Sequence, residues 1–324
     1  MTVNIALIGA GRIGQVHAKA VRASAEARLV AVDDPVDASA DAIIAATGAA
    51  RRSFDDILSD PSVNAVLICS PTDLHAAQCA AAARAGKAIF CEKPIDLDLA
   101  RAAACAENVS AAGVPAMIGF NRRFDPHFLA LKRELDSGTI GRPELVQITS
   151  RDPSPPPVGY IKRSGGLFRD MMIHDLDMAA FLLGEALEVA GVAADALVDP
   201  AIGEAGDVDT AAVTLRSTGG TIVVITNSRR ATYGYDQRIE VHGARGCLRV
   251  GNPVRTETTV LTEAGQNRPP LLDFFMDRYA NAYAAQIEAF IRLCSGQSVE
   301  VPSFAAGVAA LSLATECSAR AGID

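Results

Sequence analysis

The sequence predicts an α/β protein with two parts: a doubly wound parallel sheet, then a second domain built on a mostly antiparallel sheet. Up to about residue 120, short apolar runs alternate with longer helical patterns, and beyond it strand-like segments follow one another with little helix between them. This rhythm is typical of a parallel sheet followed by an antiparallel one. The length of 324 residues also suits about two domains. We therefore expect domains at residues 1–120 and 121–324.

The first part contains five short runs of strand-forming residues. They are Val3–Ile8, Leu29–Val32, Ala65–Cys69, Ala88–Cys91 and Ala116–Phe120. Helical patterns separate them. The first ends near Ala23, and the others span Val36–Thr47, Asp73–Ala85 and Leu97–Ala112. Glycines just beyond two of these helices, Gly48 and Gly86, are typical helix ends. Continuous apolar strands joined by helices indicate a sheet that is covered on both faces.

The second part begins with a helix near Phe128–Leu135 and a strand at Glu144–Arg151. The proline-rich segment Asp152–Pro157 is expected to be a loop, and Leu167–Leu183 a helix. Further strands are predicted at Ala211–Arg216, Thr221–Asn227, Arg238–His242, Cys247–Val250 and Thr258–Leu261. The Gly219-Gly220 pair suits a hairpin turn between the first two of these. Two helices, Asp273–Leu293 and Phe304–Arg320, finish the chain.

The composition argues against several functional classes. Hydrophobic residues make up 49% and charged residues 21%, as in globular proteins, and the net charge is −8. An acidic balance argues against a nucleic-acid partner, which favours a basic face. No apolar run reaches the length of a membrane span, and no signal peptide is evident. The seven scattered cysteines form no CxxC pair, which indicates a cytoplasmic protein without a metal site.

The motif Gly9-x-Gly11-x-x-Gly14 lies directly after the first strand, where a helix begins. The first glycine permits a tight turn, the second lets the backbone approach a pyrophosphate, and the third allows close packing of helix and strand. The helix N-terminus would bind the anion. We expect the whole motif to contact a dinucleotide, Arg12 and Ile13 included; a glycine turn without a ligand is the alternative.

An acidic pair, Asp33-Asp34, follows the second strand, twenty residues after Gly14. A carboxylate here accepts hydrogen bonds from the adenosine ribose and repels a 2′-phosphate, which favours NAD over NADP. Asp34 fits the spacing better, and Asp33 remains the alternative.

Other polar residues follow the third and fourth strands, at the edge where such sheets bind ligands. They are Ser70, Thr72, His75, Glu92 and Lys93. We expect all five to contact the cofactor. Lys93 also suits catalysis, because an ammonium group can hydrogen-bond a substrate oxygen and stabilise charge on it.

Asp170 and His174 lie four residues apart and would share one face of a helix. Histidine is the usual general base near neutral pH, and a carboxylate beside it fixes its tautomer and raises its basicity. An ion pair on a helix surface is an equally plausible interpretation of the spacing. His17, His127 and His242 are interpreted as structural or surface residues.

Together, the glycine motif, Glu92-Lys93-Pro94 and Asp170-x-x-x-His174 resemble the Gfo/Idh/MocA oxidoreductase family over the whole chain. Longer segments are similar to family members that oxidise inositols. These are Gly119–Asp125, Ser150–Pro156, Gly165–Asp175 and Tyr233–Asp236. The resemblance implies an N-terminal Rossmann domain, a C-terminal domain with a large open sheet, and assembly as a homo-oligomer, often a tetramer.

The resemblance also implies an activity: NAD-dependent oxidation of myo-inositol at one ring hydroxyl to the ketone scyllo-inosose. It places Lys93 at the reacting hydroxyl and makes Asp170 and His174 the carboxylate and base. Other positions match the lining of the family's polyol pocket. They are Asn121, Arg122, Asp152, Asp177 and Tyr235.

Two departures leave alternatives open. Asp33 adds an acid beside the usual ribose-binding position, and Asn121 stands where some inositol dehydrogenases have Met. D-chiro-inositol, scyllo-inositol or a pyranose sugar could therefore be the substrate. A relative that uses NAD transiently in glycoside hydrolysis, or a non-catalytic NAD-binding regulator, would share the same fold.

Overall fold

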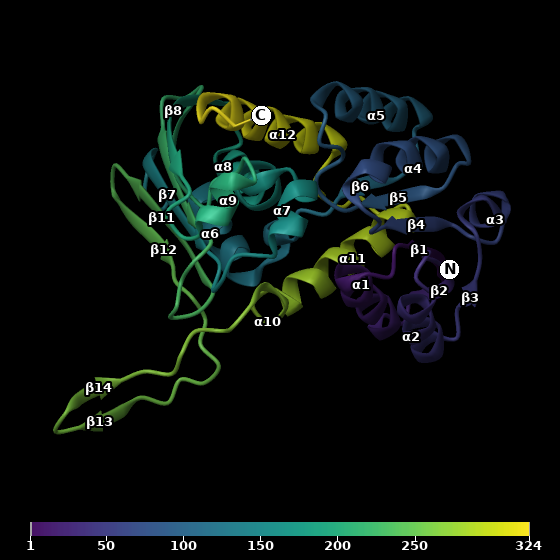
Figure 1. The fold of residues 1–324 in the computed structure, drawn as a ribbon, viewed down its shortest axis with the longest axis horizontal. Coiled ribbons are helices and arrows are strands. Elements are labelled where there is room, and N and C mark those ends of the chain that lie inside the picture. The colour runs from purple at the N-terminus through teal and green to yellow at the C-terminus, as the bar shows by residue number, and fades with distance from the viewer. Residues whose placement is uncertain (1, 324) are drawn as a thin grey trace. The chain divides into compact units, whose positions relative to one another are not determined.

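The computed structural model describes residues 2–323, which form two compact units. The first contains the chain up to Phe124 together with Asn281–Leu311, and the second contains Asp125–Ala280 and the chain from Ser312 onward. This division differs from a simple boundary at residue 120, because the chain returns to the first unit near its end. Figure 1 shows the fold, coloured along the chain.

A six-stranded parallel sheet forms the centre of the first unit, with strand order β3-β2-β1-β4-β5-β6. The order reverses between β1 and β4, which makes this the doubly wound topology that the sequence predicts. The strands are β1 (Val3–Ile8), β2 (Ala27–Asp33), β3 (Ala50–Arg51), β4 (Ala65–Ile68), β5 (Ala88–Cys91) and β6 (Ala116–Ile118). The edge strand β3 has only two residues, too few to be seen as a sequence pattern.

Helices cover both faces of this sheet, as continuous apolar strands require. They are α1 (Arg12–Ala23), α2 (Asp37–Thr47), α3 (Phe54–Ser59), α4 (Thr72–Arg84), α5 (Leu99–Ala112), the 3₁₀ turn η1 (Asn121–Phe124) and α11 (Ala280–Cys294). Helix α11 belongs here because Ile287, Phe290 and Ile291 join the core cluster that α1, α2 and the strands form. Helices α4 and α5 pack against each other (Figure 1).

The second unit contains a six-stranded sheet with the order β12-β11-β7-β10-β9-β8. Its strands are β7 (Pro143–Arg151), β8 (Leu187–Asp195), β9 (Thr210–Ser217), β10 (Ile222–Ser228), β11 (Asp236–Gly243) and β12 (Gly246–Val250). All neighbours are antiparallel except β7 and β10, which are parallel. The expected mostly antiparallel sheet is therefore confirmed, and β9 and β10 form the hairpin at Gly219-Gly220.

Helices and an arm complete the second unit. They are α6 (Pro126–Asp136), α7 (Val158–Ser164), the π-helical turn η2 (Leu167–Met172), α8 (Ile173–Leu183), α9 (Pro200–Glu204), α10 (Phe275–Arg278) and the end of α12 (Phe304–Arg320). A two-stranded ribbon, β13 (Val260–Thr262) and β14 (Gly265–Asn267), projects from the sheet as an arm (Figure 1).

Three expected elements differ in the structure. The strand predicted at Thr258–Leu261 pairs only within the arm and not with the large sheet. The predicted helix Asp273–Leu293 is interrupted at Tyr279, between α10 and α11. The predicted helix Leu167–Leu183 begins with a π-helical turn, so its first residues are wound more widely than an α-helix.

Candidate functional site

The glycine loop between β1 and α1 has the close packing that its sequence predicts. Gly9 has φ +95°, and a Cβ atom there would lie 2.5 Å from the backbone nitrogen of Ser70. A Cβ atom at Gly14 would overlap the carbonyl oxygen of Gly9. At Gly11, by contrast, a Cβ atom would meet nothing within 4 Å. The first and third glycines are thus required by packing, and the second leaves open space beside the loop.

The N-terminus of α1 adds to this open space. Gly11 is its N-cap residue and offers no side chain to the first amide groups of the helix. Unsatisfied amides and the helix dipole favour an anion at this position. The loop can therefore accommodate a phosphate group against Gly11, Arg12 and Ile13.

The structure distinguishes the two adjacent aspartates. Asp34 faces the glycine loop: its Oδ2 accepts a hydrogen bond from Ala10 N at 2.5 Å, and its Oδ1 accepts one from Val36 N at 2.7 Å. Asp33 ends β2, and its side chain is near the backbone amide of Phe54. Burial, and then the charge of Asp34, raise the pKa of Asp33. Asp34 is thus the carboxylate beside the loop.

The loops after β4 and β5 are joined by a buried histidine. His75 is 2% exposed; its Nδ1 lies 2.8 Å from the carbonyl oxygen of Pro94, and its Nε2 lies 2.8 Å from that of Ser70. Both ring nitrogens therefore contact backbone, and the ring is part of the scaffold. Ser70 Oγ donates to Gln78 Oε1 at 2.5 Å, and Thr72 begins α4.

Glu92 and Lys93 follow β5 directly. The Glu92 carboxylate turns into the protein: His17 Nε2 lies 2.6 Å from its Oε1, and its Oε2 accepts a hydrogen bond from Lys93 N at 3.2 Å. A Cβ atom at Gly119 would lie 2.9 Å from this carboxylate, so the chain after β6 closes over it. Asn121 and Arg122, in η1, are both buried.

In the second unit, the sheet register brings several predicted residues to one end of three strands. Asp152 follows β7, and its amide donates to Ser228 O of β10 at 2.9 Å. On the other side, β11 pairs Asp236 with Arg151, which places Tyr235 beside Asp152. Arg229 directly follows Ser228. The sequence places these residues far apart, and only the pairing of the strands brings them together.

Asp170 and His174 lie at the junction of η2 and α8, where π-helical winding changes to α-helical. Such π turns are frequent at functional sites. Tyr160 Oη donates to Asp170 Oδ1 at 3.1 Å, and Arg229 Nη2 lies 4.0 Å from Asp170 Oδ2. Asp177, in α8, is 2% exposed.

Asp175, next to His174 in α8, is a buried residue that the sequence analysis did not single out. It is fully buried, accepts a hydrogen bond from Ser150 Oγ at 2.6 Å through Oδ1, and accepts one from Asn227 Nδ2 at 2.8 Å through Oδ2. These bonds tie α8 to strands β7 and β10. They fix the helix that carries His174 against the strand ends that carry Asp152 and Arg229.

Arg229 is a second residue that sequence reasoning missed. Its side chain is 1% exposed, and Nη2 lies 3.8 Å from Asp207 Oδ2 as well as near Asp170. Burial raises the pKa of Asp207, and the charge of Asp170 adds to this effect while Arg229 opposes it. A buried cation therefore stands between two carboxylates. The only sequence signal was Arg229 itself, directly after a strand.

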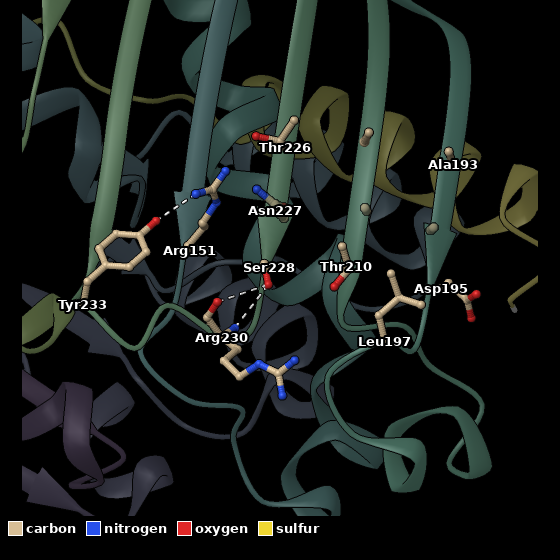
Figure 2. Close-up of a pocket in the computed structure, with 13 residues that line it drawn as sticks. Arg151, Ala193, Asp195, Leu197, Thr210, Thr226, Asn227, Ser228, Arg230 and Tyr233 are labelled. Carbon is tan, nitrogen blue, oxygen red and sulfur yellow. Dashed lines mark hydrogen bonds between the residues drawn. The ribbon is translucent and has the colours of Figure 1, made fainter.

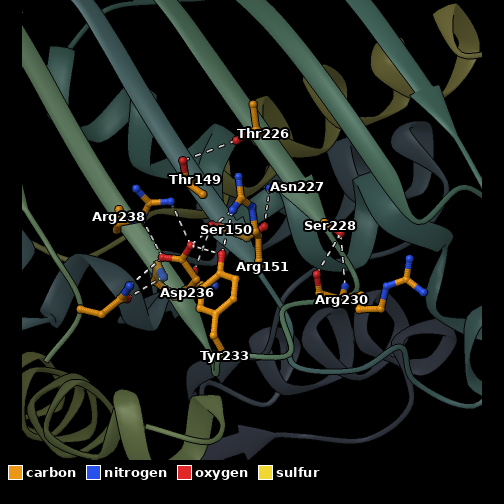
Figure 3. A network of polar contacts seen from close by, with 12 residues as sticks. Thr149, Ser150, Arg151, Thr226, Asn227, Ser228, Arg230, Tyr233, Asp236 and Arg238 are labelled. Atoms are coloured by element: carbon orange, nitrogen blue, oxygen red, sulfur yellow. Dashed lines mark hydrogen bonds and ion pairs between the residues drawn. The ribbon is translucent and has the colours of Figure 1, made fainter. Parts of the chain in front are cut away.

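A cavity of about 660 Å³ lies on the face of the second sheet that is turned away from α8 (Figure 2). Its lining includes Ala193, Thr210 and Thr226, and none of the predicted site residues. Its Arg151 is already engaged: Nη1 donates to Tyr233 Oη at 2.7 Å, which donates to Asp236 Oδ2 at 2.8 Å (Figure 3). The cavity is thus separate from the predicted site residues.

Two further searches of residues 2–323 gave negative results. No cluster of three or more His, Cys, Asp or Glu side chains could hold a metal ion. No helix within this range has the length and apolar character needed to cross a membrane.

Comparison with known proteins identifies the family. Residues 3–152 match the oxidoreductase family with an NAD-binding Rossmann fold, and residues 128–249 match the C-terminal domain of the GFO/IDH/MocA proteins. The chain is 55% identical over 314 residues to inositol 2-dehydrogenase of Rhizobium meliloti, covering 97% of this chain and 95% of that protein. The chain belongs to the Gfo/Idh/MocA family. It is an NAD-dependent oxidoreductase with an N-terminal Rossmann domain.

Two further proteins are similar to this chain over most of their length. Myo-inositol 2-dehydrogenase of Thermotoga maritima is 45% identical over 293 residues, which cover 90% of this chain and 87% of that protein. The crystal structure of scyllo-inositol dehydrogenase from Lactobacillus casei, with bound NAD(H) and scyllo-inositol, has a TM-score of 0.90 at 30% identity. The similarity covers 99% of this chain and 97% of that one.

The residues present fit NAD. The glycine loop has open space at Gly11 and an uncapped helix N-terminus for a pyrophosphate. Asp34 presents a carboxylate beside the same loop, where it can accept hydrogen bonds from a ribose and repel a 2′-phosphate.

Proposed function

We propose that this enzyme oxidises myo-inositol to scyllo-inosose with NAD. The similarity to inositol 2-dehydrogenase of Rhizobium meliloti over nearly the whole chain carries this proposal most directly. The polar side chains at the strand ends of the second unit support it, since an uncharged polyol is recognised by many hydrogen bonds. Asp152, Asp177 and Tyr235 are the proposed polyol ligands among them, and Asn121 and Arg122 are further proposed polyol ligands.

The acid–base chemistry is assigned to three side chains. We propose that His174 accepts the proton of the reacting hydroxyl, that Asp170 orients His174, and that Lys93 Nζ donates a hydrogen bond to the substrate oxygen. NAD, when bound, accepts the hydride from the same carbon. The hydroxyl thus loses a proton to His174 while its carbon loses a hydride, which leaves a ketone. Lys93 stabilises the charge that develops on the oxygen.

The first unit is proposed to bind the cofactor through three groups of residues. Gly9, Gly11, Arg12, Ile13 and Gly14 hold the pyrophosphate, Asp34 holds the adenosine ribose, and Ser70, Thr72 and Lys93 line the remainder. The Glu92 carboxylate, which the sequence analysis expected to contact the cofactor, faces His17 instead. The hydrogen bonds of Asp34 to Ala10 and Val36 favour it over Asp33 for this role. His75 contributes by joining the loops after β4 and β5.

We also propose that the enzyme works in the cytoplasm as a homo-oligomer, a tetramer by family resemblance. All seven cysteines are free thiols, which suits a reducing compartment.

The experiment that tests the proposed function is NADH formation by the purified protein. NAD is supplied with myo-inositol, scyllo-inositol, D-chiro-inositol or glucose in turn, and NADP is supplied with myo-inositol. We expect turnover of myo-inositol with NAD and little with NADP. Faster turnover of another substrate would replace myo-inositol in the proposal. A protein that binds NADH but forms none with any of these substrates would overturn the proposal.

A further inference from the structure

The segment Glu92-Lys93-Pro94 is held on both sides by buried histidines that come from different helices. On one side, His17 of α1 contacts the Glu92 carboxylate through Nε2 at 2.6 Å. On the other, His75 of α4 contacts the carbonyl oxygen of Pro94 through Nδ1 at 2.8 Å. Both histidines are at most 2% exposed. Lys93 stands between the two contacts.

The surroundings of His17 fix the direction of its ring. Phe90 and Tyr283 pack against it edge-on, with ring centroids 4.9 and 5.8 Å away. The imidazole therefore points one nitrogen at Glu92 Oε1, and the other oxygen of that carboxylate accepts the amide hydrogen of Lys93. A chain of contacts thus runs from the core through His17 and Glu92 to the backbone of Lys93.

The His75 contact has the same character. Its second nitrogen lies 2.8 Å from Ser70 O, so the ring joins the loop after β4 to the segment after β5. Gly119 lies against the Glu92 carboxylate with no room for a side chain. Buried hydrogen bonds to a carboxylate in such surroundings are strong and directional.

We propose that His17 and His75 are positioning residues that hold the backbone on either side of Lys93 and so direct its ammonium group. The inference rests on the proposed function of Lys93 and extends it to two buried histidines whose polar contacts are to Glu92, Pro94 and Ser70. A lysine has four rotatable bonds, so the direction of its amine depends on a rigid backbone at its base.

The experiment compares His17→Leu with His17→Gln. Leucine keeps the apolar packing but cannot donate to Glu92, whereas glutamine can. We expect His17→Leu to lower kcat about tenfold or more, because small misplacements of catalytic groups are costly, and His17→Gln to recover most of it. NADH affinity should stay near that of the wild type in both. His75→Leu should lower kcat in the same way, and His127→Leu, at an exposed position of α6, serves as the control.

Two readouts distinguish a positioning role from a structural one. In a Lys93→Ala background, His17→Leu should cause no further loss of kcat, because its effect passes through Lys93. The rate of Lys93 acetylation by acetic anhydride, measured by mass spectrometry relative to exposed Lys162, should change in His17→Leu and recover in His17→Gln. Additive losses of kcat with an unchanged acetylation rate would overturn the proposal. The acetylation readout needs no substrate, so it still decides if every polyol is inert and the proposed function fails.

Discussion

The two units of this protein fix the positions of their predicted site residues in different ways. In the first unit, the arrangement depends on the backbone. Gly9 and Gly14 are glycines because a Cβ atom would meet neighbouring backbone atoms, and Gly11 leaves open space beside the loop. In the second, it depends on buried side chains, with Asp175 tying α8 to the sheet and Arg229 standing between Asp170 and Asp207. The glycine loop is formed by residues that are close together in the sequence, whereas the side-chain network joins residues that are far apart in it.

The largest effect should come from removing the Asp175 network. Asp175→Ala removes the charged acceptor that Ser150 Oγ and Asn227 Nδ2 share in the core. We expect a loss of about 3–5 kcal/mol in the free energy of unfolding, since each hydrogen bond to a charged group contributes about 1.5–3 kcal/mol. Urea unfolding measures it. Asp136→Ala, which breaks only a surface ion pair with Lys132, should cost less than about 1 kcal/mol. Equal losses of unfolding free energy in the two variants would contradict the stabilising role of Asp175.

The glycine loop should respond differently at two of its positions. Gly14→Ala forces a Cβ atom against Gly9 and should destabilise the protein by about 1–3 kcal/mol. Gly11→Ala should leave stability within about 0.5 kcal/mol of wild type, because its Cβ meets no protein atom. It should nevertheless weaken NADH binding about tenfold, the equivalent of one lost hydrogen bond to a charged group. Fluorescence titration with NADH and thermal unfolding separate the two outcomes; unchanged NADH affinity in Gly11→Ala would count against a pyrophosphate at this position.

A smaller effect is expected in the pH dependence of stability. Burial raises the pKa of Asp207 in the folded protein above its ordinary value. A carboxyl group with a raised folded pKa stabilises the fold below its unfolded pKa and loses that contribution as the pH rises through the folded value. Asp207→Asn keeps an oxygen to accept from Leu167 N and does not ionise. Relative to wild type, the variant should therefore gain stability between pH 4 and pH 7, in urea unfolding at both values. A constant difference across this range would contradict the assignment.

The contrast between the units also explains how far the sequence could predict them. The strands, the helices and the glycine loop of the Rossmann domain follow from local patterns, and so does the position of Asp34. The parallel pairing of β7 with β10, which sets Asp152 beside Arg229, depends on contacts between segments that are far apart in the chain. The π-helical turn before His174 has no periodic signature in six residues.

The burial of Glu92 against His17 could not be predicted either. A carboxylate at a sheet edge suggests a ligand-binding group, and only the structure shows that it turns inward. The return of α11 to the first unit could not be predicted either. Its apolar face is visible in the sequence, but the partner of that face is not.

The most direct test of the account measures turnover and NADH binding together in Lys93→Ala and His174→Ala. If Lys93 stabilises the substrate oxygen and His174 accepts its proton, each variant should lose about 10²–10⁴-fold in kcat while it still binds NADH. Circular dichroism would verify that both variants are folded. Near-wild-type kcat in both variants would contradict the central claim and remove these residues from the chemistry.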